Sequence, residues 1–258
     1  MFKFIEKLVN RNTLYYPGCM TKFVLKDKEE QYKKILEKMG VDFIMLKNEE
    51  LCCGSPVLNS GYKEDFEEIK RKNLEKFKKY GIRKIITNCP ACCNMFKKEY
   101  GLEAEHISQT ILKNIDVFKY KNGKITENDT DKNLDRDKDQ NKDQNTDQDI
   151  VNEIEGITYH DSCHLGRHGK IYEEPRDVLR NIGFDIKEFD ENRERGICCG
   201  AGGGLKNNFP ALSNNIAKDV LKQVKTKKLI TCCPMCYQHF KDNNSDIVLL
   251  ELGDVLQW

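Results

Sequence analysis

The stretch Ile86-Thr87-Asn88-Cys89-Pro90-Ala91-Cys92 recurs 144 residues later as Ile230-Thr231-Cys232-Cys233-Pro234-Met235-Cys236. In both copies an apolar run typical of a buried strand ends just before a Cys-Pro-x-Cys group. Proline is favoured at the first position of a helix, so each group is expected to open a helix. A strand that leads through two cysteines into a helix is therefore the unit from which the rest of the chain can be interpreted.

The twelve cysteines of the 258-residue chain follow the same repeat. Five cysteines of each copy align at a nearly constant separation of 144 to 146 residues, which indicates an internal duplication. The aligned positions are Cys19, Cys52, Cys53, Cys89 and Cys92 in the first copy, and Cys163, Cys198, Cys199, Cys233 and Cys236 in the second. Cys93 and Cys232 have no aligned counterpart, and we expect them to be small buried residues rather than ligands.

Strand and helix patterns alternate in both copies, which predicts parallel sheets with crossover helices. We expect an α/β fold of two pseudo-symmetric cysteine-rich domains that face each other, residues 1–120 and 154–258, each a small parallel sheet with flanking helices. The carboxyl ends of parallel strands meet at one edge of a sheet, so the five cysteines of each copy should converge there. The predicted strands are 84–87, 41–46 and the run before Cys19 in the first copy, and 157–159, 185–189 and 229–231 in the second; the predicted helices are 26–39, 62–80, 174–182 and 209–224.

Two further segments have distinct compositions. Residues 121–153 consist largely of Asp, Asn, Lys and Gln in near-repeats and contain few apolar residues. Such a segment cannot offset the entropy of ordering it, so we expect a disordered linker between the domains. Residues 2–9 place apolar side chains on one helical stripe interrupted by charges, which predicts a packing helix rather than an export signal.

Charge and hydropathy exclude several classes of partner. The formal net charge is +1, so no overall field favours nucleic acid. No apolar run approaches the roughly 18 residues of a membrane-spanning helix, so we expect no direct membrane insertion. Without an export signal the protein is expected to be cytoplasmic, where cysteines bind metal or react as thiols rather than form structural disulfides.

Five aligned cysteines per copy favour a polynuclear iron–sulfur cluster. A structural zinc site uses four ligands, often in two close hairpins, whereas each copy has five cysteines and one hairpin; zinc at one site remains the minor alternative. Cys-Pro-x-Cys between a strand and a helix is also found in metal-free dithiol oxidoreductases. Such a site needs only two thiols, and the additional Cys-Cys-Gly groups favour cluster binding.

At the level of motifs, the chain resembles the CCG, or cysteine-rich, domain pair of the B-type and D-type proteins of heterodisulfide reductase, which is shared with the iron–sulfur subunits of glycolate oxidase and lactate-utilisation complexes. The resemblance covers nearly all of the chain outside the linker. It is carried by Cys52-Cys53-Gly54-Ser55-Pro56, Tyr159-His160-Asp161-Ser162-Cys163-His164-Leu165-Gly166-Arg167, Tyr172-Glu173-Glu174-Pro175-Arg176 and Cys198-Cys199-Gly200-Ala201-Gly202-Gly203-Gly204.

This resemblance implies a function for the ten aligned cysteines. In the B-type reductase each motif holds a non-cubane 4Fe-4S cluster, and the two clusters cleave the disulfide of coenzyme M and coenzyme B, a reaction of methanogenesis. By this resemblance the five cysteines of each copy would hold one cluster, and the protein would be an oxidoreductase, the disulfide-reducing subunit of a complex. The second copy is closer to the D and glycolate-oxidase type than to the B type.

Two alternatives remain open from the sequence. The chain could be an electron-transfer subunit of a flavin-dependent 2-hydroxy-acid (glycolate or lactate) dehydrogenase complex, or an assembly or regulatory protein that uses its clusters structurally. The D-type and glycolate-oxidase proteins carry a ferredoxin segment ahead of the repeats, and few residues precede the first repeat here. We therefore expect electrons to come from a partner, a ferredoxin-type iron–sulfur subunit, a flavoprotein subunit, or both.

Three histidines surround Cys163, namely His160, His164 and His168. Each is a candidate proton donor to a thiolate that leaves a cleaved disulfide. Alternatively, they are structural and hydrogen-bond to cluster sulfurs or to the backbone of the loop. The structural interpretation is favoured, and no catalytic residue is assigned from the sequence.

Overall fold

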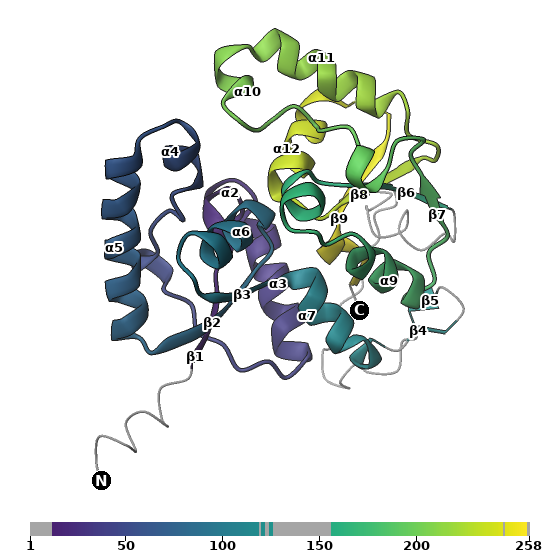
Figure 1. Ribbon diagram of the computed structural model, residues 1–258. Helices are drawn as coiled ribbons and strands as arrows, with labels where there is room; N and C mark the ends of the chain where they lie inside the picture. The colour runs from purple at the N-terminus through teal and green to yellow at the C-terminus, as the bar shows by residue number, and fades with distance from the viewer. Residues whose placement is uncertain (1–11, 119, 122–123, 126–155, 245, 257–258) are drawn as a thin grey trace, which may run out of the picture.

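The chain folds around two separate parallel sheets, which the computed structural model describes for residues 12–118, 120–121, 124–125, 156–244 and 246–256 (Figure 1). The first sheet has the order β1-β2-β3, and the second has the order β7-β6-β8-β9. All strand pairs in both sheets are parallel. The strands are β1 (Asn12–Tyr15), β2 (Ile82–Thr87) and β3 (Glu103–His106), then β6 (Ile157–His160), β7 (Ile186–Glu188), β8 (Lys228–Thr231) and β9 (Val248–Glu251).

The duplication is visible in the sheet order. Strands β6, β8 and β9 of the second half, residues 156–256, correspond to β1, β2 and β3 of the first half, residues 12–118. The position of β7 is occupied in the first half by a single bridge between Leu14 and Ile44. The strand predicted at 41–46 is thus wrong in extent, because only Ile44 exchanges backbone hydrogen bonds with β1 before the chain turns into the 3₁₀ helix η1 (Lys47–Glu49).

Helices follow the strands as the periodicity predicts. The four helices predicted from the sequence are confirmed to within a few residues as α3 (Lys26–Lys38), α5 (Lys63–Lys79), α9 (Glu173–Asn181) and α11 (Pro210–Leu221). The two Cys-Pro-x-Cys groups open α6 (Pro90–Lys98) and α12 (Pro234–Asn243), with proline at the start of both helices. The remaining helices are short, namely α2 (Gly18–Phe23), α4 (Ser55–Asn59), α7 (Ile107–Lys113) and α10 (Leu205–Asn208), with the turns η2 (Ile115–Val117), η3 (His164–His168), η4 (Arg193–Arg195) and η5 (Leu252–Leu256).

The two halves share a hydrophobic core. Each half has its own cluster of buried side chains, and a third cluster combines residues of both, such as Tyr15 and Ile107 with Tyr159 and Leu252. Across this seam, α3 packs on η5 and the equivalent α9 packs on α7, while α6 packs on η3 and the equivalent α12 packs on α2. Figure 1 shows α3 and α7 on the side of the first half that faces the second. Because equivalent elements meet in both directions, an approximate twofold axis relates the halves.

Two predictions from the sequence fall partly or wholly outside the described residues. At the start of the predicted linker, β4 (Tyr120–Lys121) and β5 (Lys124–Ile125) form a short antiparallel pair, and residues 126–155 lie outside the described part. The packing helix predicted at 2–9 lies outside it as well. Within the part of the chain that the structure describes, no helix combines the length and apolar character needed to cross a membrane.

Candidate metal centres

The five aligned thiols of the first half converge beyond the carboxyl ends of β1 and β2. Their sulfurs form a chain of contacts in which Cys52 adjoins Cys19 and Cys53, and Cys92 adjoins Cys53 and Cys89. Cys19 comes from α2, the adjacent pair from the loop before α4, and the last two from the start of α6. We name these five residues the first cysteine set. Its members span 74 positions of the sequence. They lie close together because parallel strands end at the same edge of the sheet.

The second half repeats this arrangement in the same order. The Cys198 sulfur lies 3.8 Å from that of Cys163 and adjoins Cys199, and Cys236 adjoins Cys199 and Cys233. These five residues form the second cysteine set. Convergence of both sets agrees with the repeat, and their binding of metal remains a prediction. No three His, Cys, Asp or Glu side chains in the described residues are arranged to hold a single metal ion.

The two unaligned cysteines lie outside these chains of sulfur contacts. Cys93 packs in the core of the first half, where burial raises the pKa of its thiol to about 11. Cys232 belongs to the shared core at the seam, where burial also raises its pKa and Tyr159 is a hydrogen-bonding neighbour. Both cysteines are buried, and the expectation that they are small core residues and not ligands remains a prediction.

Glycine supplies an N–H donor to the first sulfur of each Cys-Cys pair. The Gly54 N–H donates to Cys52 Sγ and the Gly200 N–H donates to Cys198 Sγ, each with a nitrogen–sulfur distance of 3.4 Å. Hydrogen bonds from neighbouring thiols, and then this backbone donor, lower the pKa of Cys52 and Cys198. Both glycines have positive φ, 85° and 87°, which residues with a side chain rarely adopt. At Gly54 an added Cβ would also lie 2.6 Å from the Phe66 ring.

The last two cysteines of each set lie at the N-terminus of a helix. Cys89 and Cys233 are the N-cap residues of α6 and α12, and Cys92 and Cys236 lie in the first turn. The partial positive charge of a helix N-terminus stabilises a thiolate. The Cys92 thiol and the first backbone N–H groups of α6 accordingly lower the pKa of Cys89. Cys89 is thus in surroundings that favour the charged form that a metal ligand requires, whereas the neighbouring thiols and burial raise the pKa of Cys92 and of Cys236.

His160 is explained by its counterpart in the first half, Tyr16. The Tyr16 hydroxyl donates to the Leu51 carbonyl over 2.7 Å, and His160 Nε2 donates to the Ile197 carbonyl over 3.0 Å. Each accepting carbonyl immediately precedes a Cys-Cys pair. Burial lowers the pKa of His160, so the ring is neutral with its proton on Nε2. His160 therefore supports the loop backbone, the role that a phenol serves in the other half.

The other two histidines lie on η3, a π-helical turn. His164 Nδ1 is 3.6 Å from Cys163 Sγ, and the His164 ring stacks on His168 at a centroid distance of 4.8 Å. The first half holds this turn, since Asn94 of α6 donates to the His164 carbonyl over 2.5 Å. Of the three candidate histidines, only His164 adjoins a thiol of the second cysteine set. The equivalent positions in the first half are Met20 and Val24, which cannot transfer protons.

Arg176 organises the loop before Cys163, a role that was not expected from the sequence. Its guanidinium is fully buried and pairs with both oxygens of Asp161 at 2.8 and 2.7 Å and with both of Glu188 at 2.7 and 2.8 Å. It also stacks on the Tyr159 ring. The Glu-Pro-Arg string was a signal for this residue, but its two acidic partners lie on other elements.

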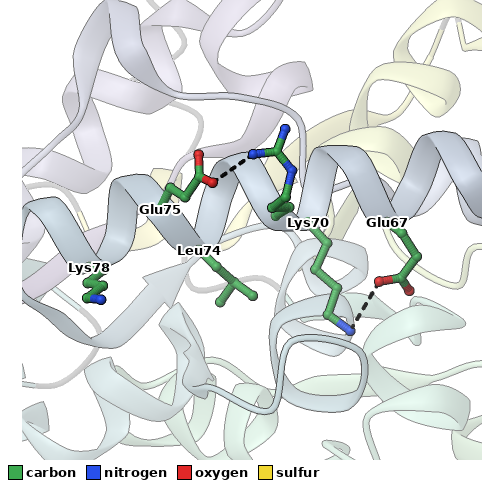
Figure 2. Close-up of a pocket in the computed structure, with 6 residues that line it drawn as sticks. Glu67, Lys70, Leu74, Glu75 and Lys78 are labelled. Atoms are coloured by element: carbon green, nitrogen blue, oxygen red, sulfur yellow. Dashed lines mark hydrogen bonds and ion pairs between the residues drawn. The ribbon is translucent and has the colours of Figure 1, made fainter.

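A surface hollow on α5 has a different character (Figure 2). It is lined by charged side chains and Leu74, and its charges pair along the helix, with Arg71 to Glu75 at 2.7 Å and Lys70 to Glu67 at 4.0 Å. These pairs are of the solvent-exposed kind that contributes little to stability. The hollow contains no cysteine or histidine, as expected for a solvated helix face.

Both halves match one known family. Residues 13–97 and 157–241 each match the family model described as the cysteine-rich domain, CCG. The chain belongs to this family. The two matched segments contain both cysteine sets, so the cysteine-rich domain is the unit that the duplication repeated.

Relatives of this cysteine-rich pair are longer proteins. An iron–sulfur protein of Methanocaldococcus jannaschii is 32% identical over 235 residues, which cover 89% of this chain and 41% of the relative. The D-type protein of the heterodisulfide reductase of Methanosarcina mazei is 30% identical over 95% of this chain and 58% of its own length. An EtfAB:quinone oxidoreductase of Syntrophomonas wolfei is also 30% identical, and the match covers 89% of this chain and 31% of that protein. The chain thus spans about half or less of the length of these relatives.

Proposed function

We propose that each cysteine set holds one iron–sulfur cluster. Five converging thiols, a glycine N–H aimed at one sulfur and a helix N-terminus at two others fit an anionic cluster held by thiolates. The cysteine-rich relative from M. jannaschii is named an iron–sulfur protein. Clusters of the non-cubane 4Fe-4S type suit five ligands better than a zinc ion, which takes four. When bound, such a cluster supplies single electrons and iron atoms that bind sulfur.

The reaction that this arrangement supports best is reduction of a disulfide, as a subunit of an oxidoreductase complex. One disulfide takes two electrons and two protons and yields two thiols. The single observation that carries the proposal is that both cysteine sets are complete and that the two halves that hold them share one core. His164, adjacent to Cys163, is positioned to hydrogen-bond a sulfur at the second set. The coenzyme M–coenzyme B disulfide is the proposed substrate, since D-type proteins of heterodisulfide reductase are among the relatives.

The electrons for this reaction have to come from outside the described residues. We assign that role to a ferredoxin-type iron–sulfur subunit or a flavoprotein subunit, because two electrons must arrive one at a time. The first cysteine set suits entry of electrons, since two exposed apolar side chains, Phe23 and Val24, follow Cys19 and offer a surface for a partner. The same observation favours a second candidate function, a relay that carries electrons from a flavoprotein, such as one that oxidises a 2-hydroxy acid.

Anaerobic purification followed by iron and sulfide analysis tests the clusters. Fewer than about two irons per chain would contradict two polynuclear sites. Electron paramagnetic resonance during titration with coenzyme M or coenzyme B thiol then separates the two functions. A disulfide-reducing site shows a signal that changes with thiol, whereas a relay shows a signal that either thiol leaves unchanged.

A further inference from the structure

Glu251 is a buried carboxylate at the seam for which the proposed reaction has no use. It ends β9, has no exposed surface, and among the described residues neither of its carboxylate oxygens has a partner in hydrogen-bond geometry. Its nearest polar neighbours, the Tyr32 hydroxyl and the Asn88 amide, come from the first half. An ionised carboxylate in such a place carries a large desolvation cost.

The lysine beside Glu251 is already paired with another acid. Lys28 forms an ion pair with Asp254, whose oxygens also accept from Gln31 Nε2 at 3.2 Å and from the Glu251 backbone N–H at 2.8 Å. Lys28 also lies 3.6 Å from the exposed Asp27, so three carboxylates share one ammonium group, and Glu251 is left without a counter-charge of its own among the described residues. The titratable groups that face it from all packed elements are Asp254, Lys28, Tyr32, Tyr15, Cys232 and Tyr237.

Glu251 adjoins the loops of both cysteine sets. Asn88 precedes Cys89, and its side chain also bonds Thr21 of α2 at 2.8 Å and accepts from Tyr15 at 3.3 Å. On the other side, Glu251 pairs with Thr231 of β8, after which Cys232 and Cys233 follow. A charge on this carboxyl group therefore faces both loops.

We propose that Glu251 is a proton-binding site between the two cysteine sets, occupied at neutral pH, whose proton responds to the charge that the two sets carry. The first part concerns the folded protein alone, whereas the response to charge rests on the proposed function. Burial, followed by the charge of Asp254, raises the pKa of Glu251 to about 8, which agrees with this geometry. Added negative charge on either set disfavours the carboxylate further and holds the proton more tightly.

The occupied site is tested by the pH dependence of stability. A pKa raised from 4.5 to about 8 means that folding takes up a proton, so stability is full below the unfolded pKa and is lost as pH rises through the folded value. The urea midpoint of the anaerobically purified protein should fall as the pH rises from about 4.5 to about 8, and that of Glu251→Gln should fall much less. If the urea midpoints of the wild type and of Glu251→Gln changed with pH in parallel, the proposed proton-binding site would be wrong.

A matched control is Glu105→Gln. Glu105 is also buried but is paired with Lys84 at 2.7 Å and with Lys113 at 2.5 Å, and its pKa is lowered. Its contribution is therefore lost as pH falls, the opposite sign. Tyr32→Phe provides a second variant, because loss of the hydroxyl that lowers the Glu251 pKa should move the loss of stability to higher pH. No upward movement in a folded Tyr32→Phe protein would count against the site.

Infrared spectroscopy of the wild type needs no variant. A carbonyl band of a buried protonated carboxylic acid should be present at neutral pH and vanish on titration, and its absence would overturn the site. Chemical reduction of the protein should move this titration to higher pH. A band that titrates identically before and after reduction of iron-loaded protein would overturn the coupling alone, whereas protein without iron would contradict the proposed function and leave the stability test decisive.

Discussion

Tyr16 and His160 occupy equivalent places in the two halves, and each donates one hydrogen bond to the carbonyl just before a Cys-Cys pair. Their rings also make the same contact, edge-on to Phe96 at 4.8 Å and to Phe240 at 4.9 Å. Both residues provide a hydrogen-bond donor on a flat ring, and the imidazole group itself is not needed for this contact. Loop support therefore accounts for His160 without any role in proton transfer.

Removing the Tyr16 donor should weaken the first loop. Tyr16→Phe keeps the ring and leaves the Leu51 carbonyl without its partner, at an expected cost of about 1 kcal/mol in the free energy of unfolding. His160→Gln should cost less, because its amide nitrogen can still donate. Urea denaturation measures both, and a Tyr16→Phe protein as stable as the wild type would contradict the supporting role.

Alanine at Gly54 should be worse than alanine at Gly61. Both glycines have positive φ, but an added Cβ at Gly61 meets nothing within 4 Å, whereas at Gly54 it meets Phe66. Gly61→Ala should cost about 1 kcal/mol for backbone strain, and Gly54→Ala an additional 1–3 kcal/mol or so for overpacking. Equal losses of stability for the two variants would show that the ring moves aside freely.

Serine at a cysteine of one set should remove one cluster only. Cys53→Ser and Cys199→Ser should each lose about half of the bound iron, because in the proposed function each set holds its own cluster. Cys93→Ser and Cys232→Ser are the matched controls and should keep their iron. Iron analysis with paramagnetic resonance provides the measurement, and simultaneous loss of both signals from a single variant is incompatible with independent sites.

Arg176 should be among the residues most sensitive to substitution. Arg176→Met leaves Asp161 and Glu188 without their buried partner, at an expected cost of about 3–5 kcal/mol. Adding Asp161→Asn should recover part of that loss, since one uncompensated charge is then gone. Comparison of the single and double variants by urea denaturation reports the coupling, and strictly additive losses would argue against a direct pair.

His106 should make the protein sensitive to acid. It is fully buried, with Nε2 donating to the Asn88 carbonyl over 3.1 Å, and burial lowers its pKa from 6.5 to about 4. The unfolded chain then binds more protons than the native one across this interval, so stability falls as pH drops, by up to about 3 kcal/mol. His106→Gln should flatten the acid limb of the stability curve, and an unchanged limb would exclude His106 as the cause.

Much of this fold could be predicted because its signals are local. The apolar run before Cys89 and the proline after it specify a strand and a helix within a few residues, and the second copy repeats both. β3 was missed because Glu103 and Glu105 give it the polarity of a surface segment. The Glu105 carboxylate is neutralised by Lys84 of the neighbouring strand and by Lys113 at the end of α7, and the alternation pattern of residues 103–106 does not show these pairs.

Convergence of the thiols could likewise be predicted, since parallel strands bring their ends together. The seam could not. Glu251 and His106 are ordinary polar residues in the sequence, and their burial depends on how the two halves dock, with Tyr32 of α3 meeting η5. That docking is determined by side chains more than 200 positions apart, such as Lys28 and Asp254.

The shared core places a self-complementary interface inside one chain. Equivalent helices meet in both directions across it, which is the geometry of a twofold homodimer whose subunits have been joined. In a true homodimer every change is made twice and both sites remain identical. A duplicated single chain lacks that constraint. Equivalent positions hold different side chains, Met20 against His164 and His106 against Glu251, so either half can change alone while both keep one common core.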